Sequence, residues 1–180
     1  MKKVIISLSL ICLLLSGCDE INNTPIKQVE SMFNKYQTLD QDVLDDLDRI
    51  ISEEMVFDTT AREEYRKLIK EQYQNLTYKI KDEVIDGDNA TVTSEITVTD
   101  YSKVLAESET YKNSHLSEFQ DELGVYQPTK YSNYVISQLK DAKEKVKYTV
   151  EVRLTKFEDK WKINGIDEDT EDKILGIYEY

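Results

Sequence analysis

Residues 147–165 read KYTVEVRLTKFEDKWKING, and this stretch carries the clearest strand pattern in the chain. Apolar side chains occupy every second position from Tyr148 to Leu154, and Trp161 begins a return after a polar turn at 158–159. A period of two places successive side chains on opposite faces of a strand. The stretch therefore predicts an antiparallel hairpin with one buried face.

A second hairpin is predicted upstream, over residues 76–99. Tyr78 and Ile80 alternate with polar residues, and DGDN at 86–89 is a hairpin signal of the type I′ kind. Residues 90–99 then return with apolar and small side chains on one face and threonines and a glutamate on the other. The threonine-rich face suits a pleated surface that is exposed to solvent.

The segments outside the hairpins have apolar residues at helical spacing. The predicted helices begin after Thr24, after Asp40 and at a capping box formed by Thr60 and Glu63, and recur over residues 101–119, over 128–142 and in a short C-terminal tail. This order predicts an α+β domain, with helices packed on one face of a bent, mainly antiparallel sheet of about four strands.

The order of elements over residues 24–166, with its strand–turn–DKWKI ending at 159–163, resembles small uncharacterised lipoproteins with a cystatin-like fold. Within that fold the chain is most similar to the group related to nuclear transport factor two. The resemblance implies a cone, in which helices close over a strongly bent sheet. The extra helices between the two hairpins depart from its simplest version and leave the strand order open.

The first eighteen residues resemble the signal sequence and lipobox of bacterial lipoproteins. Two lysines precede an apolar run that is too short to span a membrane comfortably, and the run ends at Leu15-Ser16-Gly17-Cys18. In the resemblance, Leu15, Ser16 and Gly17 form the recognition site of the signal peptidase, where small residues give access to the bond before Cys18. The Cys18 thiol accepts diacylglycerol as a thioether.

The resemblance divides the chain into a lipoprotein signal peptide (1–17), a lipidated cysteine with a short spacer (18–23) and a single α+β domain (24–180). One acyl chain such as palmitate binds a membrane only marginally, whereas two chains anchor stably. We therefore expect a lipid-anchored protein on the extracytoplasmic face of a bacterial cell membrane. Abundant Lys, Ile, Asn and Tyr, with few Gly and Pro, favour a Gram-positive cell.

Charge and cysteine content exclude several classes of function. The chain has 23 basic and 36 acidic residues and a net charge of −13, which argues against binding to nucleic acid. Cys12 leaves with the signal peptide and lipid blocks Cys18, so we expect no disulfide, no redox pair and no cysteine nucleophile. We expect no cofactor.

Neither the single histidine nor the acidic runs form a recognisable catalytic or metal motif. His115 has no G-x-S-x-G partner motif and no second histidine for zinc, and we expect an ordinary, partly buried side chain. The acidic runs 40–48 and 167–172 lack the glycine and the final acid of an EF-hand loop. Solvated charged surfaces are the better interpretation of both runs.

Twelve tyrosines are the remaining unusual feature of the composition. Amphipathic aromatic residues fill cores or line ligand clefts. If the domain has a cleft between the helices and the concave sheet, we expect five aromatic side chains around it: Phe33, Tyr36, Tyr73, Tyr148 and Trp161.

The leading hypothesis is a non-enzymatic binding or interaction module of the cell envelope, held at the membrane through lipid on Cys18. Its partner is an unknown envelope protein or a small apolar ligand. One alternative is an envelope enzyme that acts through carboxylates, which requires an acid with a raised pKa in a pocket. Another is that residues 10–17, LICLLLSG, are the source of a secreted peptide pheromone.

Overall fold

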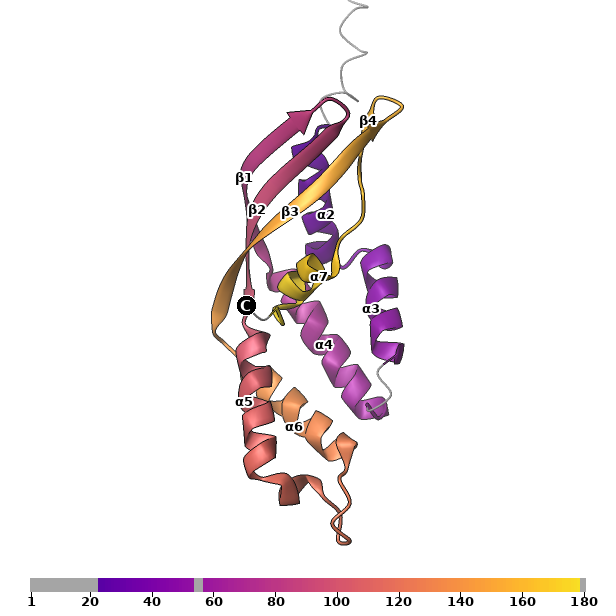
Figure 1. Cartoon of the computed structure of the whole chain (residues 1–180). Helices are drawn as coiled ribbons and strands as arrows, with labels where there is room; N and C mark the ends of the chain where they lie inside the picture. The colour runs from indigo at the N-terminus through magenta and orange to yellow at the C-terminus, as the bar shows by residue number, and fades with distance from the viewer. Residues whose placement is uncertain (1–22, 54–56, 179–180) are drawn as a thin grey trace, which may run out of the picture.

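The computed structural model describes residues 23–53 and 57–178, and it has the predicted α+β architecture (Figure 1). A four-stranded antiparallel sheet has the strand order β1-β2-β3-β4. Its strands are β1 (Thr77–Asp86), β2 (Asn89–Thr99), β3 (Lys145–Phe157) and β4 (Lys160–Ile163). The helices are α2 (Pro25–Thr38), α3 (Gln41–Glu53), α4 (Thr59–Asn75), α5 (Tyr101–Ser114), α6 (Pro128–Asp141) and α7 (Glu168–Leu175), with a short 3₁₀ helix η1 (Leu116–Phe119).

One face of the sheet is buried under helices, as the alternating pattern predicts. On β2 and β3 the pairs Val92–Val152 and Ile96–Tyr148 lie opposite each other, and all four side chains are buried. Helices α2, α4 and α7 contact this face, and the intervening residues of β3 are mostly exposed. The strands curve along their length, and β1 carries a bulge between residues 80 and 82 (Figure 1). The finer resemblance to the cone of nuclear transport factor two stays a prediction.

The first hairpin turn differs from the predicted type, and the second lies at residues 158–159 as predicted. In the first turn only Gly87 has a positive φ, of 58°, which is the pattern of a type II′ turn rather than the predicted type I′. In the second turn Glu158 and Asp159 have φ values of 49° and 60°, which is the type I′ pattern. The left-handed region raises the conformational energy of residues other than glycine, so the second turn is strained at Glu158 and Asp159. The sequence of this turn contains no glycine that would indicate such a conformation.

The helix starts are set by short polar side chains. The Thr24 hydroxyl accepts a hydrogen bond from the backbone N–H of Lys27 at 3.2 Å, and the Asp40 carboxylate accepts one from Asp42 N–H at 3.2 Å. The predicted capping box of the third helix is wrong, because α4 begins earlier and is capped by Asp58. The Asp58 carboxylate accepts from the N–H of Ala61 at 2.8 Å and satisfies a first-turn donor.

Helices α5 and α6 form a helical hairpin that is inserted between two paired strands. Thr99 at the end of β2 lies opposite Lys145 at the start of β3, and Asp100 N–H donates to Glu144 O at 2.9 Å. The hairpin projects away from the sheet along the long axis of the molecule (Figure 1). The predicted helix over 101–119 is divided, with α5 ending at Ser114 and η1 following.

A buried glutamine ties the base of this helical hairpin to the rest of the domain. Gln72 on α4 donates its amide hydrogens to Thr99 O at 2.9 Å and Leu175 O at 3.0 Å, and its carbonyl accepts from Thr99 N–H at 3.0 Å. The carbonyl of Gly176 accepts from the N–H groups of Tyr101 and Ser102, both at 2.8 Å. The junction therefore satisfies the first donors of α5 with backbone from the C-terminal segment.

Candidate functional site

The five aromatic residues predicted for a cleft lie in three different environments. Phe33 and Tyr148 are core residues, with exposed fractions of 0% and 2%. Phe33 stacks on Tyr78 with ring centroids 4.6 Å apart, and the Tyr148 hydroxyl donates to Tyr178 O at 3.1 Å. Trp161 is partly buried on β4, and its backbone N–H donates to the side-chain oxygen of Asn23 at 2.8 Å.

Tyr36 and Tyr73 are the members of the predicted set that line a hollow together. Their rings meet edge to face at 5.0 Å, beside Glu171 on α7. Burial raises the pKa of the Tyr36 hydroxyl to about 12, and burial followed by repulsion from Asp46 raises the pKa of Glu171. The hollow has a volume of about 30 Å³, which is enough for about one water molecule.

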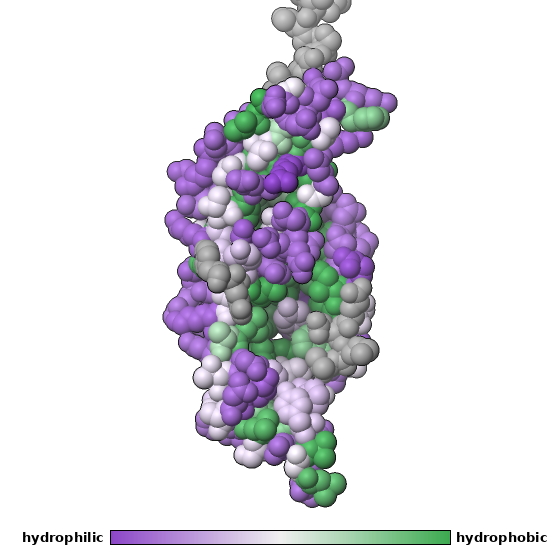
Figure 2. Space-filling view, viewed as in Figure 1, coloured by the Kyte–Doolittle hydropathy of each residue, from purple (hydrophilic) through white to green (hydrophobic). Residues whose placement is uncertain are grey.

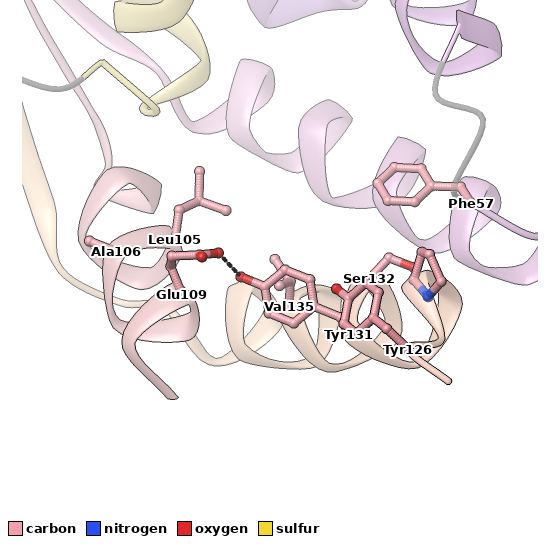
Figure 3. Close-up of a pocket in the computed structure, with 9 residues that line it drawn as sticks. Phe57, Leu105, Ala106, Glu109, Tyr126, Tyr131, Ser132 and Val135 are labelled. Atoms are coloured by element: carbon pink, nitrogen blue, oxygen red, sulfur yellow. Dashed lines mark hydrogen bonds between the residues drawn. The ribbon is translucent and has the colours of Figure 1, made fainter. Parts of the chain in front are cut away.

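A much larger cavity lies between the helical hairpin and Phe57 (Figure 3). Its volume is about 850 Å³, within the range of pockets that bind small molecules. The lining residues are Phe57, Leu105, Ala106, Glu109, Tyr126, Pro128, Tyr131, Ser132 and Val135. The space-filling view shows a hollow with apolar walls in the middle of the molecule, above the end of the helical hairpin (Figure 2).

The cavity continues inward toward the core. A second space of about 170 Å³ shares Phe57, Leu105 and Val135 with the larger one. Its inner walls are apolar side chains of α3, α4, α5 and α6 and of the C-terminal segment: Ile50, Tyr65, Tyr101, Ile136, Leu139 and Ile177. Residues of helices far apart in the sequence thus enclose one apolar cleft, which narrows toward the base of the helical hairpin.

A small polar group stands at the edge of the cavity. The Tyr131 hydroxyl donates to the Glu109 carboxylate at 3.2 Å (Figure 3). Lys112 Nζ lies 2.6 Å from the same carboxylate and 4.6 Å from the centroid of the Tyr131 ring. Hydrogen bonding to Lys112 lowers the pKa of Glu109, whereas burial, and then the hydrogen bond to Glu109, raises the pKa of Tyr131 to about 12. At neutral pH the edge therefore presents the Glu109 carboxylate and the neutral Tyr131 phenol, with Lys112 Nζ beside both.

Sequence reasoning missed this cavity, although three of its helical residues were among the apolar residues of the predicted helices. Leu105, Tyr131 and Val135 have helical spacing on two segments, and helices that only pack against each other show the same pattern. Phe57 and Tyr126 fall between predicted helices, where nothing in the sequence places them beside α6. The available signal was the number of aromatic residues between 101 and 135.

The prediction that His115 is partly buried is wrong, because the side chain is exposed. Its ring stacks on Tyr111 with centroids 4.0 Å apart, and Nδ1 lies 2.9 Å from the Ser114 hydroxyl and 3.1 Å from Tyr111 O. Tyr111 also stacks on Tyr134 at 4.9 Å across the helical hairpin. The histidine therefore extends an aromatic stack that holds α5 against α6.

The acidic runs have local roles. Asp42 pairs with Lys35 at 2.8 Å, and Asp48 pairs with Arg66 at 2.9 Å. Asp167 caps α7 by accepting from Thr170 N–H at 2.9 Å. Within residues 23–53 and 57–178, no group of three or more His, Cys, Asp or Glu side chains could hold a metal ion.

The predicted lipobox, Leu15-Ser16-Gly17-Cys18, lies outside the residues that the structure describes. Among the helices of the described part, none is long and apolar enough to cross a membrane.

Comparison with known proteins gave one structural likeness. No family model matches the chain, and no curated protein matches it. A crystal structure from Bacillus subtilis, of a protein (YcdA) described provisionally as a lipoprotein, matches with a TM-score of 0.40 and 19% sequence identity. The match covers 67% of this chain and 38% of the other, so the chain spans well under half the length of that protein.

Proposed function

We propose that this protein is a lipoprotein of a bacterial, and by composition Gram-positive, cell envelope whose domain binds a small apolar ligand without transforming it. The apolar cavity of about 850 Å³ between α5, α6 and Phe57 carries the binding part of the proposal. Cavities of this size, with mostly apolar walls and few polar groups, are typical ligand sites. The lipobox at Cys18 carries the anchoring part.

The walls define the class of ligand. Leu105, Val135 and Phe57 offer apolar contact at the point where the cavity joins its inner extension. The edge offers the Glu109 carboxylate, whose charge Lys112 offsets, and the Tyr131 phenol. This arrangement fits an amphiphile or a mainly hydrocarbon molecule whose apolar part enters the cleft and whose polar end remains near Tyr131.

The positions of the acids support binding rather than catalysis. An enzyme acting through carboxylates needs an acid with a raised pKa in a space that admits a substrate. Glu171 has a raised pKa beside a hollow, but that hollow, at about 30 Å³, has room for little more than water. In the cavity of about 850 Å³ that would hold the ligand, the acid is Glu109, and hydrogen bonding to Lys112 lowers its pKa.

Binding is tested with the neutral apolar fluorophore N-phenyl-1-naphthylamine. We expect a saturable rise in fluorescence, and we expect Ala106→Trp to weaken binding at least tenfold because Ala106 lines the cavity and its exposed position tolerates a larger side chain. The matched control is Asn133→Trp on α6, an exposed residue that is not among the lining residues. Saturable binding that survives Ala106→Trp unchanged would place the ligand elsewhere, and no saturable binding would contradict the proposal.

Anchoring is tested by metabolic labelling with an alkyne fatty acid. We expect Cys18→Ser to abolish labelling and to release the protein into the medium, and Cys12→Ser to leave both unchanged, because Cys12 lies in the segment that the signal peptidase removes. Label that persists in Cys18→Ser would refute the assignment of the lipid site.

A further inference from the structure

We infer that the end of the domain with the two β-turns rests on the bilayer and inserts Val84, Ile85 and Phe157 into its interface. The inference rests on the proposed lipid anchor at Cys18. It adds a second, non-covalent membrane contact and a fixed orientation of the domain.

These three residues are large apolar side chains left in solvent at the same end of the molecule. Their exposed fractions are 59%, 53% and 57% for Val84, Ile85 and Phe157. The two turns are held together, since Asn89 is paired with Thr155 and the N–H of Lys156 donates to Asp88 O at 2.7 Å. Apolar side chains exposed together in this way commonly mark an interaction surface.

The first described residues of the chain lie at this same end. The Asn23 side chain accepts a hydrogen bond from Trp161 N–H on β4, at 2.8 Å. The N–H of Ile26, in the first turn of α2, donates to the Glu83 carboxylate next to Val84, at 3.2 Å. Figure 1 shows the start of α2 beside the two turns, at the end opposite the tip of the helical hairpin.

The chain between the lipid site and the domain is short, and this points to the membrane as the partner of the apolar surface. Cys18 and Asn23 are five residues apart, and an extended chain spans at most about 3.6 Å per residue, so the tether reaches at most ~18 Å. A domain held this close to its acyl chains must turn the end that carries Asn23 toward the bilayer. Val84, Ile85 and Phe157 are the apolar side chains that this end presents.

Charge at this end favours apolar insertion over electrostatic attraction. The turns carry acids, among them Asp86, Asp88 and Glu158, which offset the nearby lysines. Lys162 Nζ lies over the Phe157 ring at 4.8 Å and can extend its ammonium group toward headgroups while Phe157 enters the interface. We therefore expect the contact to form on zwitterionic lipid and to be insensitive to salt.

The test uses the full lipidated protein in phosphatidylcholine vesicles, with an NBD fluorophore on Phe157→Cys. The matched control is Leu123→Cys, an apolar residue with an exposed fraction of 88% in the loop between α5 and α6, at the opposite end of the molecule. Because lipid occupies Cys18, each variant has one free thiol. We expect doxyl-labelled lipid to quench position 157 several-fold more than position 123, equally at low and high salt.

The outcomes separate this inference from the anchor. Mass spectrometry of the same sample reports the lipid on Cys18. A lipidated protein in which positions 157 and 123 are equally unquenched would overturn the insertion and leave the anchor intact, whereas an unmodified Cys18 would overturn both. The native Trp161, the only tryptophan of the chain, gives a second readout without substitution, since brominated lipid should quench it when the turns lie at the interface.

Discussion

Replacing Gly176 with alanine tests the junction that holds the helical hairpin to the domain. Gly176 ends α7 in the left-handed region with φ of 77°, and a Cβ added there would lie 2.1 Å from Thr99 O and 2.6 Å from Gln72 Nε2. Gly124, in the loop between α5 and α6, has nearly the same φ of 79°, but a Cβ there would meet no atom of the described residues within 4 Å. Alanine at either position would therefore have the same backbone strain, but only at residue 176 would its methyl group collide with neighbouring atoms.

The expected magnitudes follow from these two contributions. A left-handed alanine costs roughly 1–2 kcal/mol, so Gly124→Ala should destabilise the fold by about that amount. At residue 176 the methyl group must also displace Gln72 Nε2, which donates to Thr99 O and Leu175 O. These two hydrogen bonds, one buried and one part-buried, add about 2 kcal/mol at about 1 kcal/mol each, so Gly176→Ala should cost about 3–4 kcal/mol in total.

The assay is urea unfolding followed by circular dichroism, on residues 18–180 with Cys18→Ser so that no lipid is present. The free energy of unfolding is obtained by linear extrapolation with a common slope. An equal decrease in the free energy of unfolding for the two variants would refute the reasoning. It would show that Thr99 and Gln72 adjust to the added methyl group without loss of stability. A loss at Gly124 near zero would instead refute the strain assigned to the left-handed region.

Three further predictions concern the core, a turn and pH. Ser94 is fully buried and its hydroxyl has no hydrogen-bond partner among residues 23–53 and 57–178, so Ser94→Ala should raise the free energy of unfolding by about 1 kcal/mol in the same assay. Replacing Glu158 with Asn and Asp159 with Gly should stabilise the second hairpin by roughly 1 kcal/mol, because both positions have positive φ; an unchanged urea midpoint would contradict the type I′ assignment. Since the pKa of Tyr36 is raised to about 12, the folded state keeps a proton that the unfolded chain releases from about pH 10. Stability should therefore be fully present below pH 10 and fall as pH rises toward 12, and Tyr36→Phe should flatten that fall, with absorbance at 295 nm reporting the ionisation.

The strands and helices were predictable because their signals are local. Alternation along β3 and the capping residues Thr24 and Asp40 act within a few residues, and both describe the structure correctly. Turn geometry was less accessible, since Glu158 and Asp159 adopt a conformation that their side chains disfavour. The pairing of β3 with β4 and the burial of one sheet face require positive φ values at these two residues. Tertiary packing therefore overrides the backbone preference of Glu158 and Asp159.

The site depended on contacts that no local pattern encodes. An aromatic residue at helical spacing can face a core, a cavity or another helix with the same sequence signature, as Phe33, Tyr131 and Tyr134 do. Gln72 is a further case. The role of this polar residue on an apolar helix face depends on its hydrogen bonds to Thr99 O and Leu175 O, which are distant in the sequence. The position of the inserted helical hairpin decides the environments of Tyr131 and Tyr134 and of the Thr99 backbone that Gln72 contacts.

The inserted hairpin also determines where a ligand would come from. Helices α5 and α6 extend beyond the end of the sheet (Figure 1), and the cleft beside them is also lined by Phe57 and by residues of α3, α4 and the C-terminal segment. Asn23 and the two β-turns lie at the other end of the long axis (Figure 1). If Cys18 anchors that end, the cleft faces outward, and bilayer lipid cannot enter it without first leaving the membrane. The orientation therefore favours a ligand that arrives from outside the cell, and exchange of the fluorophore on intact cells should match exchange on the lipid-free protein. Much slower exchange on cells would show that the membrane covers the cleft and would reverse the orientation.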